Sequence, residues 1–229
     1  MKINPIQQTN NALAAGIFSV LMLLFSIGYA AQSDIRLSFD NLTEWTEKSF
    51  KGHTTYTQVQ EDGKTVLQAV AVKTASALYK KIAVNSAEVP IIKWSWKVKR
   101  AIPVNNLYRK DVDDFAGRVM VIFPGTLFWQ VRTIVYVWSD NLPVGTVMPS
   151  AFGNNIALIV IETGNQHAGV WRHERRNYLE DYRNYFHASP PNAISVAVMT
   201  DADNTISEAT AWYGDIILTR DFEQKISSN

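Results

Sequence analysis

The sequence predicts an all-β domain, an antiparallel β-sandwich of jelly-roll type with one short helix. Apolar and polar residues alternate with a period of two along many short segments, as in half-buried strands. Turn-forming residues separate these segments, for example at 61–64, 124–125 and 201–204. Apolar residues make up 47% of the chain, so one domain can fill a hydrophobic core.

The first thirty residues are expected to be a signal peptide. An apolar stretch covers residues 12–31, and Lys2 is the only charged residue before it. Gly28 and Ala30 are small, which suits cleavage after Ala30. A retained membrane anchor is the alternative, because the stretch is long enough to span a bilayer. Residues 31–229 then form a single domain in the periplasm or the secreted fraction.

Strands are expected throughout this domain. Their ranges are 35–39, 65–72, 77–84, 92–98, 118–123, 132–138, 156–161, 169–173, 194–200 and 210–218. The clearest is 92–98, where Trp94 and Trp96 alternate with Lys93, Ser95 and Lys97. We therefore place both tryptophans in the core and the lysines on a solvated face.

Residues 175–186 have the period of a helix instead. Tyr178, Tyr182 and Phe186 recur every four residues and share one face. Asn177 is the expected N-cap, and the helix is expected to end before Pro190.

Three expected strands, at 118–123, 132–138 and 156–161, are apolar on both faces. We place Arg118, Arg132, Tyr136 and Trp138 together on an outer sheet face. Mixed arginine and aromatic side chains there indicate a concave ligand-binding surface. The alternative is that the helix or a long loop packs on this face.

Composition excludes several classes of protein. The net charge of +1 argues against nucleic-acid binding and against a polybasic membrane anchor. The absence of cysteine excludes disulfides, cysteine nucleophiles and cysteine-ligated metals. The four histidines lack zinc-binding spacing, and neither a serine-hydrolase elbow nor a phosphate-binding glycine loop occurs.

Two acidic segments are candidate sites. Asp113 and Asp114, together with Asp111, precede the strand that Arg118 enters. They can pair with Arg118, bind calcium or a ligand, or act as an acid–base pair. Asp201 and Asp203 belong to a turn that also resembles part of a calcium loop. Calcium is the one cofactor that the sequence suggests.

Further candidate ligand contacts lie near the helix and the C-terminus. Arg176 can bind an anionic ligand or form a pinning ion pair with Asp181. Trp212 is a candidate platform for a sugar ring, and Asp215 is a candidate partner for its hydroxyls.

Several strings in combination resemble a bacterial exported family known as domain of unknown function 3047. They lie at 94–97, 113–119, 136–138, 176–182, 199–205 and 211–216. The resemblance runs from about residue 39 to residue 218, and it implies export and a single domain but no particular chemistry. More loosely, 39–45 and 213–218 are similar to the first and last strands of galactose-binding-like jelly rolls. Many of those modules bind sugars, and many hold a structural calcium.

These patterns together predict an exported module that binds a glycan or another small polar ligand. The alternatives are a structural or interaction protein of the cell envelope and a carbohydrate-active enzyme that uses Asp113 and Asp114. After signal cleavage, no membrane association and no nucleic-acid partner are expected.

Overall fold

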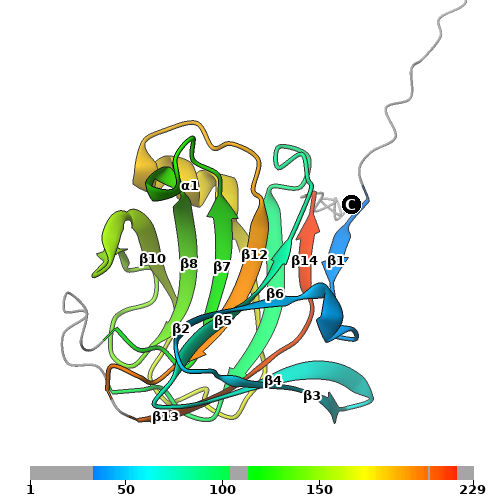
Figure 1. The fold of residues 1–229 in the computed structure, drawn as a ribbon, viewed down its shortest axis with the longest axis vertical. Coiled ribbons are helices and arrows are strands. Elements are labelled where there is room, and N and C mark those ends of the chain that lie inside the picture. The colour runs from blue at the N-terminus through cyan, green and yellow to red at the C-terminus, as the bar shows by residue number, and fades with distance from the viewer. Residues whose placement is uncertain (1–32, 104–112, 206, 221–229) are drawn as a thin grey trace, which may run out of the picture. The chain divides into compact units, whose positions relative to one another are not determined.

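In a computed structural model, two β-sheets pack face to face (Figure 1), and the predicted fold class is confirmed. The structure describes residues 33–103, 113–205 and 207–220, so the predictions for residues 1–30 and for Asp111 lie outside the described residues. No helix within the described part of the chain is long and apolar enough to cross a membrane.

Among the described residues each sheet has seven strands. The first sheet runs β1-β14-β6-β13-β4-β3, with β11 on the other edge of β6, and the second runs β2-β5-β12-β7-β8-β10-β9. The strands are β1 (Ile35–Leu37), β2 (Thr46–Lys51), β3 (Thr55–Glu61), β4 (Lys64–Val72), β5 (Ala75–Lys81), β6 (Ile91–Val98), β7 (Arg118–Phe123), β8 (Arg132–Ser139), β9 (Val147–Ser150), β10 (Gly153–Thr163), β11 (Arg172–Asn177), β12 (Ser195–Asp201), β13 (Glu208–Tyr213) and β14 (Ile216–Thr219). The helices are α1 (Tyr178–Phe186) and the short 3-10 turns Leu42–Glu44 and Phe128–Gln130.

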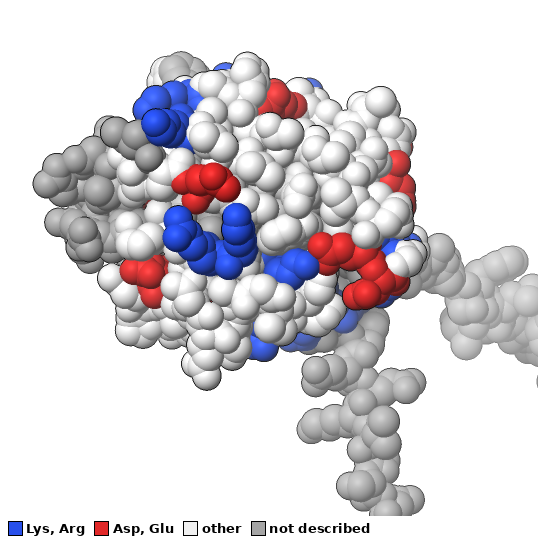
Figure 2. All heavy atoms as spheres, turned by 90° about the horizontal axis from the view of Figure 1, so that it is seen from below, with Lys and Arg blue, Asp and Glu red and all other residues white. Residues whose placement is uncertain are grey.

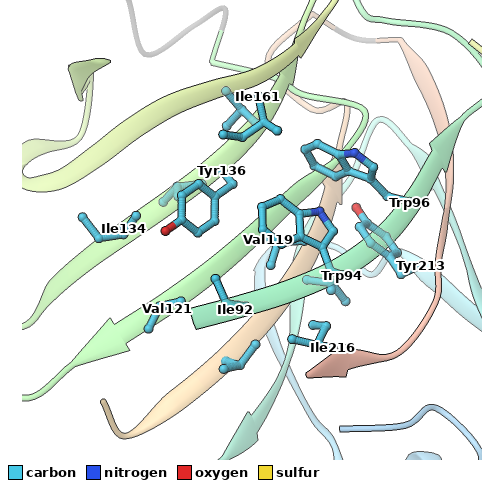
Figure 3. Close-up of a cluster of buried hydrophobic side chains, with 14 of the residues drawn as sticks. Ile92, Trp94, Trp96, Val119, Val121, Ile134, Tyr136, Ile161, Tyr213 and Ile216 are labelled. Atoms are coloured by element: carbon cyan, nitrogen blue, oxygen red, sulfur yellow. The ribbon is translucent and has the colours of Figure 1, made fainter. Parts of the chain in front are cut away.

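The core lies between the sheets and is rich in aromatic rings (Figure 3). Trp94 of β6 stacks on Tyr136 of β8 with ring centroids 5.0 Å apart, and Trp96 packs against Trp138 at 5.7 Å. Such pairs add about 0.5–1.5 kcal/mol beyond the burial of their surface. The prediction that Trp94 and Trp96 are core residues is therefore confirmed.

The same core corrects the predicted face of β8. Arg118 pairs with Val137 across β7 and β8, which puts Tyr136 opposite Val119. Because partners across a ladder share a face, Tyr136 and Trp138 point inward, and both are fully buried. The expectation that they share an outer face with Arg118 is wrong. The spacing predicts the alternation within each strand, but it does not determine the register between the two strands.

Other elements differ in detail from the sequence prediction. Strands β2, β3 and β9 were not predicted. The expected strand 210–218 is two strands, and the one expected at 169–173 lies at Arg172–Asn177. Strands β8 and β10 pair in parallel, which departs from the antiparallel expectation.

Helix α1 begins as predicted. The side chain of Asn177 accepts a hydrogen bond from the backbone N–H of Glu180 at 3.1 Å. The helix ends at Phe186 and is capped by His187, which takes a left-handed conformation (φ 50°). Tyr182 packs against Phe123 with ring centroids 4.6 Å apart. Because α1 contacts β11 and β6 of one sheet and β8 of the other, it joins the two sheets near one end of the sandwich.

Candidate functional site

The predicted site residues do not form one site. The structure distributes them over three places: one end of the second sheet, the underside of α1, and the outer face of the first sheet. Trp138 is in none of these places because it belongs to the core.

Arg118 is the centre of the first place, at the end of the second sheet. Its Nε donates to Asp201 Oδ1 at 2.9 Å and its Nη2 donates to Asp201 Oδ2 at 2.5 Å. Nη2 also donates to the carbonyl of Asp113 at 2.6 Å, and the guanidinium lies 4.6 Å from the ring centroid of Phe115. All of these groups are buried. Arg118 therefore holds together two segments that are far apart in the sequence.

Burial has a marked effect on Asp201. It raises the pKa of this carboxyl to about 7, while the charge and hydrogen bonds of Arg118 oppose the rise. Burial lowers the pKa of Arg118, but the carboxylates of Asp201 and Asp113 raise it by more. The guanidinium is therefore charged at every pH at which the protein folds.

Asp114 belongs to the same place but has different partners. It accepts hydrogen bonds from the backbone N–H groups of Asn204 and Thr205, at 3.2 and 2.6 Å, and from the Thr205 hydroxyl. Asp203 pairs with Lys51. Carboxylate oxygens of Asp114, Asp201 and Asp203 lie within 4.8 Å of one another and can reach a single ion. The two predicted acidic segments thus meet, and calcium binding there stays a prediction.

The predicted acid–base pair is not exposed. Asp113 and Asp114 are 1% and 0% exposed, and Asp114 is saturated by the donors of the 204–205 turn. Glycoside hydrolysis needs two carboxyl groups that flank a substrate in an open cleft. Neither of these side chains is placed to do so.

The second place lies beneath α1. Asp181 accepts a forked pair of hydrogen bonds from Arg176 and a third from the hydroxyl of Tyr136 at 2.8 Å. Arg132 donates to the Tyr182 hydroxyl at 3.0 Å, and its guanidinium lies 4.9 Å from the centroid of the Phe186 ring. These contacts fasten the helix to β8 and β11, which agrees with the pinning alternative for Arg176 and Asp181.

The third place is the outer face of the first sheet, where Trp212 and Asp215 lie. Lys97 stands between two indoles, 4.5 Å from the ring centroid of Trp212 and 5.1 Å from that of Trp171. Glu61 accepts hydrogen bonds from Lys97 at 2.7 Å and from the indole of Trp171 at 3.0 Å. Asp215 pairs with Arg36.

A hollow of about 960 Å³ opens on this face, and we call it the first-sheet hollow. It lies where β13 and β14, which both pair with β6, separate at Gly214 and Asp215. Gly214 donates its N–H to the carbonyl of Ser95 at 2.9 Å, and a Cβ on Gly214 would lie 2.2 Å from Ser95 Oγ. A side chain at position 214 would therefore displace the Ser95 hydroxyl from its present position.

Polar side chains cover the floor of the hollow. Because Trp94 and Trp96 point into the core, Lys93 and Ser95 of β6 point outward. On the neighbouring strand β11, Arg175 lies directly opposite Lys93, and His173 lies opposite Ser95. Trp171, the turn between β3 and β4, and β1 complete the walls.

The outer face of the second sheet carries a different cavity, a groove of about 800 Å³ that we call the second-sheet groove. Its floor is made of small or apolar side chains from the central strands. These are Ala75, Ala77, Met120, Ile122, Val135, Ala197 and Met199. Phe50, Tyr79 and Phe152 line it too, and the cluster around Arg118 forms one end.

Comparison with known proteins identifies the family. Residues 43–217 match the family described as protein of unknown function (DUF3047). The chain belongs to this family. A comparison with curated protein sequences gave no match.

Among solved structures, the chain is similar to a family 11 carbohydrate-binding module of a cellulosomal cellulase from Clostridium thermocellum. The identity is 12%, the TM-score is 0.48, and the match covers 86% of this chain and 99% of that one. It is also similar to the xyloglucanase domain of NopAA, a type three effector from Sinorhizobium fredii. There the identity is 7%, the TM-score is 0.45, and the match covers 83% of this chain and 100% of that one.

Sequence reasoning identified Asp215 at the margin of the first-sheet hollow and Trp212 on the same outer face, but it missed the floor of the hollow. Lys93, Ser95 and His173 were not considered as site residues. The signal that could have identified the floor is the polar half of the alternation at 92–98, which the pattern alone places on a solvated face. Seen from below, the domain has basic and acidic side chains side by side within mostly uncharged surface (Figure 2).

Proposed function

We propose that this protein is an exported module that binds a glycan in the first-sheet hollow. The observation that carries the proposal is the make-up of the hollow. A partly exposed indole, Trp171, stands beside hydroxyl, amine and imidazole groups that come from two adjacent strands. The volume of the first-sheet hollow, about 960 Å³, lies in the range of small-molecule sites.

A sugar needs this combination. Its ring has apolar C–H faces and a rim of hydroxyl groups, so it binds where an aromatic surface lies next to hydrogen-bonding side chains. Ser95 Oγ can donate or accept, Lys93 Nζ donates, and His173 does either according to its tautomer. The rigid strands β6 and β11 hold these groups at fixed positions. A sugar hydroxyl placed there exchanges hydrogen bonds with water for hydrogen bonds with protein.

Export is the second part of the proposal, and the apolar stretch at residues 12–31 with its small residues before Ala31 supports it. Cell fractionation followed by mass spectrometry of the purified protein tests this part. We expect the protein in the periplasmic or secreted fraction, with Ala31 as its first residue. A protein confined to the cytoplasm with an intact N-terminus would contradict it.

A glycan array probed with the purified protein tests binding, and calorimetry with the best ligand then measures affinity. We expect His173→Ala to weaken binding about fivefold, because one hydrogen bond contributes about 1 kcal/mol. Phe50→Ala is the matched control, since Phe50 is exposed and lines the second-sheet groove. Binding that depends on Phe50 and not on His173 would place the ligand in the other cavity and refute the proposed site.

A further inference from the structure

We propose that the second-sheet groove binds a long-chain carboxylic acid, with its hydrocarbon chain lying across the strands and its carboxylate at Lys48. This inference goes beyond the proposed function, because it concerns the other outer face of the sandwich and a different class of ligand. It follows from the apolar floor of the groove, the length of that floor and the position of one exposed lysine.

Two rows of outward-pointing side chains run across the strands and form the floor. The first row consists of directly paired residues on β5, β12, β7 and β8, namely Tyr79, Ala197, Met120 and Val135. The second row consists of Ala77 of β5 and Met199 of β12, and it ends at Arg118 of β7. Because neighbouring strands are about 4.8 Å apart, the first row extends about 14 Å across the sheet. The floor is therefore long and narrow, as an extended alkyl chain is.

The floor offers few hydrogen bonds to a ligand. In the two rows, only Tyr79 and Arg118 have side chains with N–H or O–H groups. The guanidinium of Arg118 already donates to the carboxylate of Asp201 and to the carbonyl of Asp113. A sugar or an extended peptide on this floor would lose hydrogen bonds to water without replacing them. A hydrocarbon chain has none to lose, and it gains free energy when it leaves water.

The size and the walls of the groove suit the same ligand. Its volume of about 800 Å³ lies in the range of small-molecule sites. Phe50, whose residue surface is 64% exposed, and Phe152 line the groove from outside the central strands. A chain that lies against these rings removes apolar surface of the protein from water as well as its own.

Lys48 places a positive charge at one end of the floor. It lies on the edge strand β2, lines the groove and is exposed. The other two basic side chains of the groove have carboxylate partners, since Lys51 pairs with Asp203 and Arg118 pairs with Asp201. Within the described part of the chain, no carboxylate lies within ion-pair distance of Lys48 Nζ. A ligand carboxylate at this end can accept a charge-assisted hydrogen bond from Lys48.

Calorimetry with matched amphiphiles tests the inference on the full chain. Laurate and caprate carry the same carboxylate and differ by two CH₂ groups, and both are used below the concentrations at which they form micelles. We expect laurate to bind about tenfold more tightly, because each CH₂ group that leaves water adds to the affinity. Equal affinities, or no binding of laurate, would overturn the inference and leave the proposed glycan site untouched.

The neutral probe 1-dodecanol has the same chain as laurate and tests the role of Lys48. We expect it to bind about fivefold more weakly than laurate, and Lys48→Gln should remove this difference. Lys99→Gln is the matched control, because the Lys99 side chain is 66% exposed and does not line the groove. A preference for laurate that survives Lys48→Gln, or that is lost equally in both variants, would overturn the inference.

Met120→Glu tests the floor by placing a carboxylate in the middle of the first row. We expect at least tenfold weaker binding of laurate, with thermal unfolding as the check that the variant folds. Val144→Glu is the matched control, because Val144 is exposed and lines neither cavity. If Met120→Glu does not fold, the surface variant Lys48→Gln still decides the question.

Two results with Met120→Glu would overturn the inference. Unchanged binding of laurate would place the chain elsewhere on the protein. A dimer of the wild type in analytical ultracentrifugation that Met120→Glu dissociates and laurate does not would assign the groove to a second copy of the domain.

Discussion

The two outer faces of the sandwich are built by the same strand periodicity but have opposite character. On the first sheet, the outward positions of β6 are Lys93, Ser95 and Lys97, and the face is polar. On the second sheet, β7 shows Met120 and Ile122 outward, and the groove is apolar over its central strands. Alternation therefore determines which face is buried in the core. The chemistry of the other face depends on the residues that alternate with the core.

The ion pairs of the two faces differ in how far their side chains are exposed to water. Arg36 and Asp215 meet at the surface of the first sheet, where the Arg36 side chain is 67% exposed. Arg118 and Asp201 meet at the end of the second sheet, where their side chains are 6% and 2% exposed. Water screens the charges of the first pair. In the second pair each charge has lost its hydration on burial, and its partner compensates for that loss.

The largest expected effect comes from breaking the buried pair. Asp201→Ala leaves the guanidinium of Arg118 buried without its main counter-charge, and we expect a loss of about 3–5 kcal/mol in the free energy of unfolding. Arg36→Ala, which breaks the exposed pair, is the control and should cost less than about 1 kcal/mol. Urea denaturation of both variants measures the difference. Similar costs for the two variants would show that burial does not distinguish these pairs.

We expect an intermediate effect on stability at Gly214, whose backbone lies close to Ser95 of β6 at the edge of the first-sheet hollow. In Gly214→Ala the added Cβ would lie 2.2 Å from Ser95 Oγ, so the Ser95 hydroxyl must rotate away from its present position. We expect a cost of about 1–3 kcal/mol and weaker glycan binding. Adding Ser95→Ala removes the clashing oxygen and should restore part of the stability. If the double variant is no more stable than Gly214→Ala, the contact with Ser95 is not the cause.

The smallest expected effect concerns Glu174, on the inner side of the strand that borders the hollow. Burial raises its pKa, while the hydrogen bond from Trp96 acts in the opposite direction. A raised pKa means that the folded state holds the proton more tightly than the unfolded chain does. The stabilisation is therefore present at low pH and is lost as the pH rises through the folded pKa.

Glu174→Gln removes this charge and keeps an acceptor for the Trp96 indole. We expect the variant and the wild type to be equally stable near pH 4. At pH 7.5 the variant should be more stable by less than about 1 kcal/mol, because Glu174 is partly exposed. Thermal unfolding at both pH values measures this. A difference that does not change with pH would contradict the assigned cause.

The sequence predicted those parts of the fold that depend on local pattern. The strand around Trp94 and Trp96 and the helix capped by Asn177 are where spacing places them. Strand β2 was missed because all six of its residues are exposed, so no apolar face marks it. The break between β13 and β14 was missed because it depends on how closely Gly214 approaches a different strand.

The site was harder to predict because its contacts join distant segments. The predicted pairing of the 113–114 segment with Arg118 is present through Asp113, whose carboxylate lies 3.6 Å from the guanidinium. The main partner of Arg118, however, is Asp201, which is 83 positions away. Tyr136 was placed on the wrong face because the register between β7 and β8 is not encoded in either strand alone. Long-range pairing of this kind is a property of the whole sheet.

The most direct test of the account is to map where a glycan binds. Backbone amide shifts of the isotopically labelled protein, recorded by NMR during titration with the oligosaccharide that binds best on the glycan array, report which strands respond. We expect the largest changes in β6, β11 and β14, around Lys93, Ser95 and His173. Changes confined to β5, β12 and β7, with Met120 and Ala197 at their centre, would place the ligand in the second-sheet groove and contradict the central claim.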